Sequence, residues 1–156
     1  MKSLRIIIAC LFFAALTSGV TTAQKPSRME QLNAQRVAFI TEKLQLTPEE
    51  AQVFWPVYNE YRNKKNALEQ EKIKLLRDYA AHRETLTDQE TEDIADKYVR
   101  IGKKEADLMI QYHEKIKKVL PIKKVMMLYR VERQFQAFLL KQLRDQRAKN
   151  NRPRNF

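Results

Sequence analysis

Glycine and cysteine are scarce in this chain of 156 residues, and both shortages limit what the protein is. The two glycines, Gly19 and Gly102, are too few for a Gly-rich phosphate-binding loop or for the tight turns of an all-β sandwich. The single cysteine, Cys10, allows no disulfide within the chain. No segment alternates apolar and polar residues with the period of a strand. These absences favour an all-α fold.

The N-terminal residues are typical of an export signal. Lys2 and Arg5 precede an apolar run from Ile6 to Leu16, and small residues ending at Ala23 follow. The run is too short to cross a ~30 Å hydrocarbon core, so a permanent membrane anchor is the weaker alternative. We therefore predict a signal peptide over residues 1–23, cleaved after Ala23. Cleavage would also remove Cys10, the one cysteine, and leave a mature chain without thiols. Such a chain is compatible with an oxidising compartment, which in a host with two membranes is the periplasm.

Capping signals divide the remaining chain into helices. A Ser or Thr that caps a helix, followed three residues later by a Glu that reaches back, forms a capping box. The chain has three: Ser27 with Glu30, Thr47 with Glu50, and Thr87 with Glu90. Each precedes a segment whose apolar residues recur at helical spacing.

Four helices are expected from these boundaries. They span Arg28 to about Leu44, Pro48 to about Glu84, Asp88 to about Val119, and Ile122 to about Arg147. Pro56 should bend the second helix, and Pro121 should break the chain before the fourth. The predicted fold is all-α, an elongated, thin bundle or cradle of about four helices, two of them long. It occupies residues 24–149, with a disordered basic tail over residues 150–156.

The apolar residues of the two long helices recur at helical spacing and form one stripe on each. The stripe of the second helix is Phe54, Tyr58, Tyr61, Leu68, Leu75 and Tyr79, and that of the third is Ile94, Tyr98, Ile101, Leu108, Tyr112 and Ile116. Charged residues interrupt both stripes. Lys65 and Lys72 fall on the stripe of the second helix, and Glu105 falls on that of the third. Such interruptions favour a loosely closed bundle or a curved sheet of helices over a dense four-helix core.

Few residues could support catalysis. After the predicted cleavage site the chain has one serine, Ser27, and two histidines, His82 and His113. A nucleophile paired with histidine is therefore not expected, and the Glu-x-x-His motif of di-iron bundles is absent. We predict that the protein is not an enzyme and needs no cofactor. Met109 and His113, four residues apart, could begin a site for a soft metal, with simple packing as the alternative interpretation.

Positive charge is concentrated near the C-terminus. Residues 115–156 contain 13 basic and two acidic side chains, out of a net charge of +11 for the whole chain. Such a segment attracts anionic partners, although an exported protein does not meet nucleic acid. The candidate binding residues are its basic side chains and one aromatic contact: Lys117, Lys118, Lys123, Lys124, Arg130, Arg133 and Trp55. A merely solvated basic face is the alternative.

Two short motifs carry a family resemblance. Leu46-Thr47-Pro48-Glu49-Glu50 and Leu86-Thr87-Asp88-Gln89-Glu90 lie 40 residues apart, and each begins a long predicted helix. In this the chain resembles the LTxxQ family of periplasmic helical proteins, the Spy and CpxP type, with Glu where the family name has Gln. The segment from Leu46 to Tyr61 resembles the branch often labelled sensors of ECF-type sigma factors.

The resemblance implies a thin, cradle-shaped helical protein, often an antiparallel dimer, with a basic concave face. Spy-like members hold unfolded polypeptides without ATP, CpxP-like members serve the periplasmic domain of a sensor kinase, and other relatives sense metals. The prediction is a non-enzymatic envelope-stress protein that binds unfolded or acidic polypeptides or a sensor domain. The alternatives are a heavy-metal sensor and an electrostatic binder of the anionic envelope surface.

Overall fold

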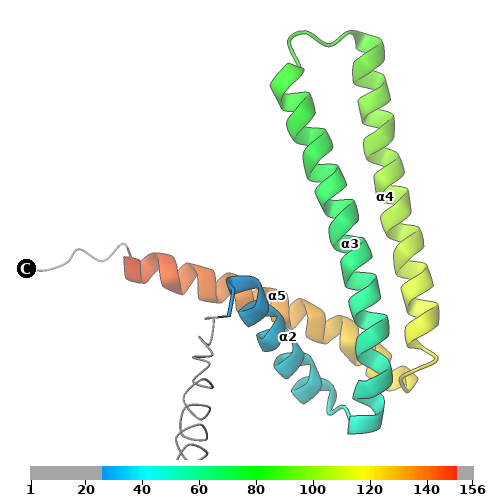
Figure 1. Cartoon of the computed structure of the whole chain (residues 1–156), viewed down its shortest axis with the longest axis vertical. Coiled ribbons are helices and arrows are strands. Elements are labelled where there is room, and N and C mark those ends of the chain that lie inside the picture. The colour runs from blue at the N-terminus through cyan, green and yellow to red at the C-terminus, as the bar shows by residue number, and fades with distance from the viewer. Residues whose placement is uncertain (1–25, 151–156) are drawn as a thin grey trace, which may run out of the picture. The chain divides into compact units, whose positions relative to one another are not determined.

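The computed structural model describes residues 26–150, so the predicted signal peptide and the chain from residue 151 onward lie outside it. The described part forms four α-helices and no strand (Figure 1). They are α2 (Arg28–Leu44), α3 (Pro48–His82), α4 (Asp88–Ile116) and α5 (Ile122–Asn150). The all-α prediction is confirmed. Only two long helices were expected, but α5 has 29 residues, as many as α4.

All three predicted capping boxes are present. The N–H of Glu50 donates to Thr47 Oγ1 at 3.2 Å, and the N–H of Thr47 donates to the Glu50 carboxylate at 3.0 Å. Thr87 and Glu90 make the same two bonds, in the same order, at 3.3 and 2.9 Å, as do Ser27 and Glu30 at 3.2 and 2.6 Å. Each box satisfies N–H groups of the first turn that have no partner within the helix, and this favours a helix start at that position. The three helices therefore begin where the sequence predicts.

The two prolines act differently. α3 continues through Pro56 as one helix, whereas Pro121 lies in the short break between α4 and α5, as predicted. α3 and α4 end two or three residues before the predicted ends, since no side-chain signal in the sequence marks those ends.

The junction between α2 and α3 is closed without glycine. Gln45 follows α2 with φ 48°, a left-handed conformation that glycine usually adopts at this position. The N–H of Leu46 donates back to the Thr41 carbonyl at 3.1 Å. Lys124 Nζ donates to the Gln45 carbonyl at 2.8 Å and to the Glu50 carboxylate at 2.5 Å, so α5 is tied to this junction.

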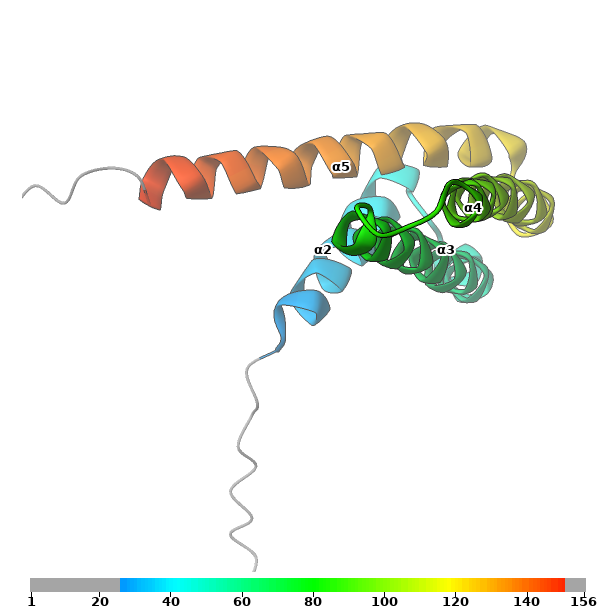
Figure 2. The ribbon, with the colours of Figure 1, turned by 90° about the horizontal axis from the view of Figure 1, so that it is seen from above.

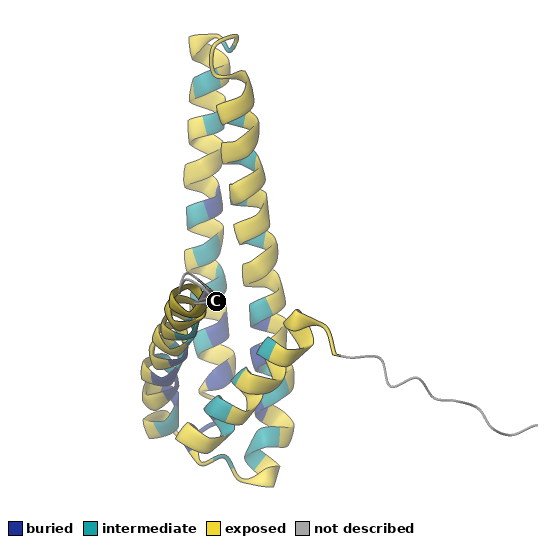
Figure 3. Cartoon of the chain, turned by 90° about the vertical axis from the view of Figure 1, so that its left-hand side faces the viewer, coloured by how far each residue is buried: buried dark blue, intermediate teal, exposed yellow. Residues whose placement is uncertain are grey.

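The chain divides at Ala34 and Gln35 into two units, and the packing described below is that of the second. Its core lies where the second half of α2, the start of α3, the end of α4 and the first half of α5 meet (Figure 3). The stacked rings of Tyr61 and Tyr112, 4.0 Å between centroids, join α3 to α4 there. The buried cluster comprises Ile40, Leu44, Phe54, Tyr58, Tyr61, Tyr112, Ile116, Leu120, Val125, Leu128 and Val131.

Beyond this core α3 and α4 continue side by side as an antiparallel hairpin, while α5 crosses its base (Figures 1 and 2). We call residues 65–82 of α3 and 88–108 of α4 the hairpin arms. Ile101 is the one buried residue in the arms. The predicted apolar stripe of α4 therefore does not form a continuous core, and Tyr98, placed on that stripe, is 42% exposed.

Candidate polypeptide-binding surface

Apolar side chains are exposed on one face of the hairpin arms. Ile73 and Leu76 of α3 are 38% and 46% exposed, and Tyr98 of α4 is 42% exposed. Leu76 is four residues after Lys72, and Tyr98 is seven residues before Glu105, so each pair shares one face of its helix. We call Ile73, Leu76 and Tyr98 the arm patch.

An ion pair between the two arms joins these helix faces. Lys72 Nζ lies 2.6 Å from the Glu105 carboxylate and 5.7 Å from the ring centroid of Tyr98. The bond to Glu105 raises the pKa of Lys72 despite partial desolvation. The side chains of Lys72 and Glu105 are only 19% and 25% exposed, so their stems are largely buried where the two arms meet. Two of the three charged residues that interrupt the predicted stripes, Lys72 and Glu105, thus pair with one another.

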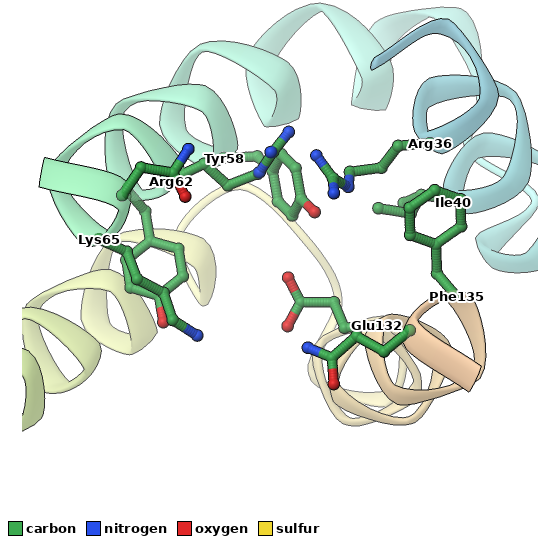
Figure 4. A pocket seen from close by; sticks show the side chains of 10 residues that line it. Arg36, Ile40, Tyr58, Arg62, Lys65, Glu132 and Phe135 are labelled. Atoms are coloured by element: carbon green, nitrogen blue, oxygen red, sulfur yellow. The ribbon is translucent and has the colours of Figure 1, made fainter. Parts of the chain in front are cut away.

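A cavity of about 200 Å³ lies at the foot of the same face, between α2, α3 and α5 (Figure 4). Lys65, seven residues before Lys72 and on the same side of α3, is an exposed residue of its lining. Arg36, Arg62 and Glu132 also line the cavity, beside apolar groups. Its full lining is Arg36, Ile40, Tyr58, Tyr61, Arg62, Lys65, Asn66, Glu132, Phe135 and Gln136.

Glu132 is the carboxylate of this cavity. It faces the Tyr58 hydroxyl, and its negative charge is opposed by the positive charges of Lys65, Arg36 and Arg62. Burial nevertheless raises the pKa of Glu132, because desolvation of the carboxylate outweighs these favourable interactions. Burial likewise raises the pKa of Tyr58, with the Glu132 charge adding to the effect.

The predicted basic residues differ in how far they are available to a partner. Lys124 is half-buried and holds the α2–α3 junction, while Lys117 pairs with Glu114 at 2.7 Å. The other four are exposed and lie in no ion pair within residues 26–150. These four are Lys118, Lys123, Arg130 and Arg133.

Trp55 is half-buried against the core and is not part of the arm patch. Its ring lies edge-on to Phe54 and Tyr58, with centroids 4.8 and 5.4 Å away. Phe54 and Tyr58 themselves are buried, as their positions on the predicted stripe indicate. Trp55 therefore presents only part of its ring to solvent.

Met109 and His113 take part in packing between helices. The Tyr61 hydroxyl donates to Met109 Sδ at 3.3 Å, and His113 Nδ1 lies 2.7 Å from the Tyr129 hydroxyl. Within the described residues no three His, Cys, Asp or Glu side chains are placed to hold a metal ion. Their suggested role as metal ligands stays a prediction.

The cavity and the arm patch were not found from the sequence. Arg36 and Arg62 resemble ordinary surface cations, because only the packing of three helices brings them together beside Glu132. The one signal in the sequence was the position of Lys65 on an apolar stripe. It could be matched with Glu132 only once the packing of α5 against α3 is known.

Among residues 26–150 no helix combines the length and apolar character required to cross a bilayer. Comparison of the chain with protein families, with curated proteins and with solved structures found no match.

Proposed function

We propose that the protein binds polypeptides in the cell envelope without catalysing a reaction, as an ATP-independent holdase chaperone or as a stress-sensing regulator. The observation that carries this proposal is the arm patch. Ile73, Leu76 and Tyr98 stay exposed on two long helices whose arms, within the described residues, contain a single buried residue, Ile101. Exposed apolar side chains grouped on one face are typical of an interaction surface.

The surrounding charge supports a reversible, weak mode of binding. α5 carries eight basic and two acidic residues. Of the four exposed basic residues identified above, Lys118 lies just before α5, and the other three lie in its first half. Such charges attract an acidic chain at long range and mainly raise the rate of encounter. The separated apolar contacts then hold the chain weakly, so that it is released without an energy source.

The proposal is tested by suppression of aggregation of an unfolded acidic protein, with a basic one as control. One variant reverses the four exposed cations Lys118, Lys123, Arg130 and Arg133 to Glu. Lys117 and Lys124 are kept, since both already make ion pairs and Lys124 holds the α2–α3 junction. A charge-matched control reverses Lys141, Arg144, Arg147 and Lys149 further along α5.

The parent should protect the acidic protein at low salt and less at ~0.15 M, where the Debye length is about 8 Å. The first variant should protect less than its charge-matched control. Equal protection by both variants would show that only net charge matters. Absence of protection by the parent would contradict holdase activity and favour a sensor with one specific partner.

A further inference from the structure

The cavity between α2, α3 and α5 contains more positive charge than its own carboxylate balances. Arg36, Arg62 and Lys65 face a single acid, Glu132. Figure 4 shows Arg36 of α2 and Arg62 of α3 extending toward one another over the ring of Tyr58, with Glu132 of α5 below. The lining therefore has an excess of two positive charges when Glu132 is ionised.

One donor of Arg36 is unsatisfied within residues 26–150. Its Nη1 atom is buried and has no hydrogen-bond partner among the residues that the structure describes. Its guanidinium lies 5.0 Å from the ring centroid of Phe135, so one face is covered by an aromatic ring. Desolvation lowers the pKa of Arg36, and the nearby charge of Arg62 lowers it further. A buried N–H donor without an acceptor destabilises the folded protein unless a ligand supplies one.

The shape of the cavity suits a short acidic side chain. Its volume of about 200 Å³ holds several water-sized groups, given ~30 Å³ per water molecule in the liquid. Ile40, Tyr61 and Phe135 provide apolar walls for methylene groups, and the guanidinium groups provide paired donors for a carboxylate. Lys65, an exposed residue of the lining, shares its face of α3 with Lys72 and Leu76, so a chain lying on the arm patch passes close to the cavity.

We infer that this cavity is a receptor for a carboxylate, the side chain of a Glu or Asp in a bound polypeptide, held by Arg36 and Arg62. The inference rests on the proposed function and adds which polypeptide segments the surface prefers. The arm patch holds apolar residues of the partner, while the cavity selects segments in which an acidic residue lies near them.

The test compares two labelled unfolded peptides that differ only in carrying Glu or Gln, by fluorescence anisotropy at constant ionic strength. The parent should bind the Glu peptide more tightly. Arg36→Gln should reduce this preference about tenfold, since charge-assisted hydrogen bonds of this kind are worth about one order of magnitude in affinity. Arg144→Gln removes the same charge from an exposed site outside the cavity and should leave the preference unchanged.

A second variant keeps the test decisive if Arg36→Gln fails to fold, which circular dichroism detects. Glu132→Gln removes the competing carboxylate at nearly constant shape and should strengthen binding of the Glu peptide several-fold. Unchanged or weaker binding would overturn the inference, as would an equal loss of preference in the Arg36 and Arg144 variants.

The outcomes also separate this inference from the proposed function. If the parent binds both peptides equally, polypeptide binding stands and the cavity is not a carboxylate receptor. If it binds neither peptide, the proposed function fails. If it binds free glutarate but not the Glu peptide, the occupant is a small carboxylate and the inference as stated is overturned.

Discussion

Truncation of two leucines separates the core from the hairpin arms. Leu128 of α5 is 0% exposed and belongs to the buried cluster, whereas Leu76 of α3 is 46% exposed in the arm patch. Both lie inside long helices, so Leu→Ala changes helix propensity equally at the two positions. The pair therefore compares burial alone.

The expected magnitudes follow from the exposed fractions. Leu128→Ala removes fully buried methyl groups and leaves a cavity, which costs about 2–5 kcal/mol. Full burial of a leucine is worth about 1.5–3 kcal/mol, and Leu76 realises about half of it, so Leu76→Ala should cost about 1 kcal/mol or less.

The assay is equilibrium unfolding in urea, followed by circular dichroism at two protein concentrations. Leu128→Ala should lower the unfolding midpoint clearly, and Leu76→Ala should lower it by much less. An equal loss in both variants would refute the view that the arms lack a core. If the destabilisation caused by Leu76→Ala also depended on protein concentration, it would indicate that a second copy of the chain covers the arm patch.

Three further predictions concern the caps, the tyrosines and pH. Thr47→Ala and Thr87→Ala should each cost ~1 kcal/mol of helix stability; hydrogen exchange should show opening throughout the core for the first and only at the hairpin tip for the second. Tyr112→Phe should raise the free energy of unfolding by about 1 kcal/mol in urea titrations, because its buried hydroxyl has no partner among the described residues. Tyr58→Phe removes a hydroxyl that favours the ionised form of Glu132 and should lower the free energy of unfolding; the reverse order of the two variants would contradict this reasoning. Because the pKa of Glu132 is raised above 4.5 in the folded state, the folded protein holds a proton on Glu132 at pH values where the unfolded chain has lost it. The contribution of Glu132 to the free energy of unfolding therefore falls as the pH rises. The difference in free energy of unfolding between the parent and Glu132→Gln should follow this trend from pH 4.5 to 7, and a difference independent of pH would contradict it.

Helix starts and the main core residues could be predicted from the sequence because their causes are local. A capping box needs only two residues three apart, and Thr47, Glu50, Thr87 and Glu90 all make the expected bonds. Phe54 and Tyr58 are buried as their spacing indicates.

The candidate site could not be predicted because its causes are not local. Periodicity marks Tyr98 as a core position, but none of the helices in residues 26–150 covers it, so it stays exposed. Arg36, Arg62 and Glu132 come from three helices and meet only through the packing of α5 against α2 and α3. Lys124 has the sequence signature of a surface charge, yet its role depends on the carbonyl of Gln45, 79 residues away.

Site-specific photo-crosslinking tests the central claim, that polypeptides bind on the face of the arms that carries the arm patch. A photoreactive amino acid replaces Leu76 in one variant and Ala67 in the other. Ala67 is exposed, and nine residues of helix place it half a turn from Leu76, on the opposite face of α3. With an unfolded acidic protein at low salt, we predict strong crosslinks from position 76 and few from position 67. Equal crosslinking at both positions, or none at position 76, would contradict the account.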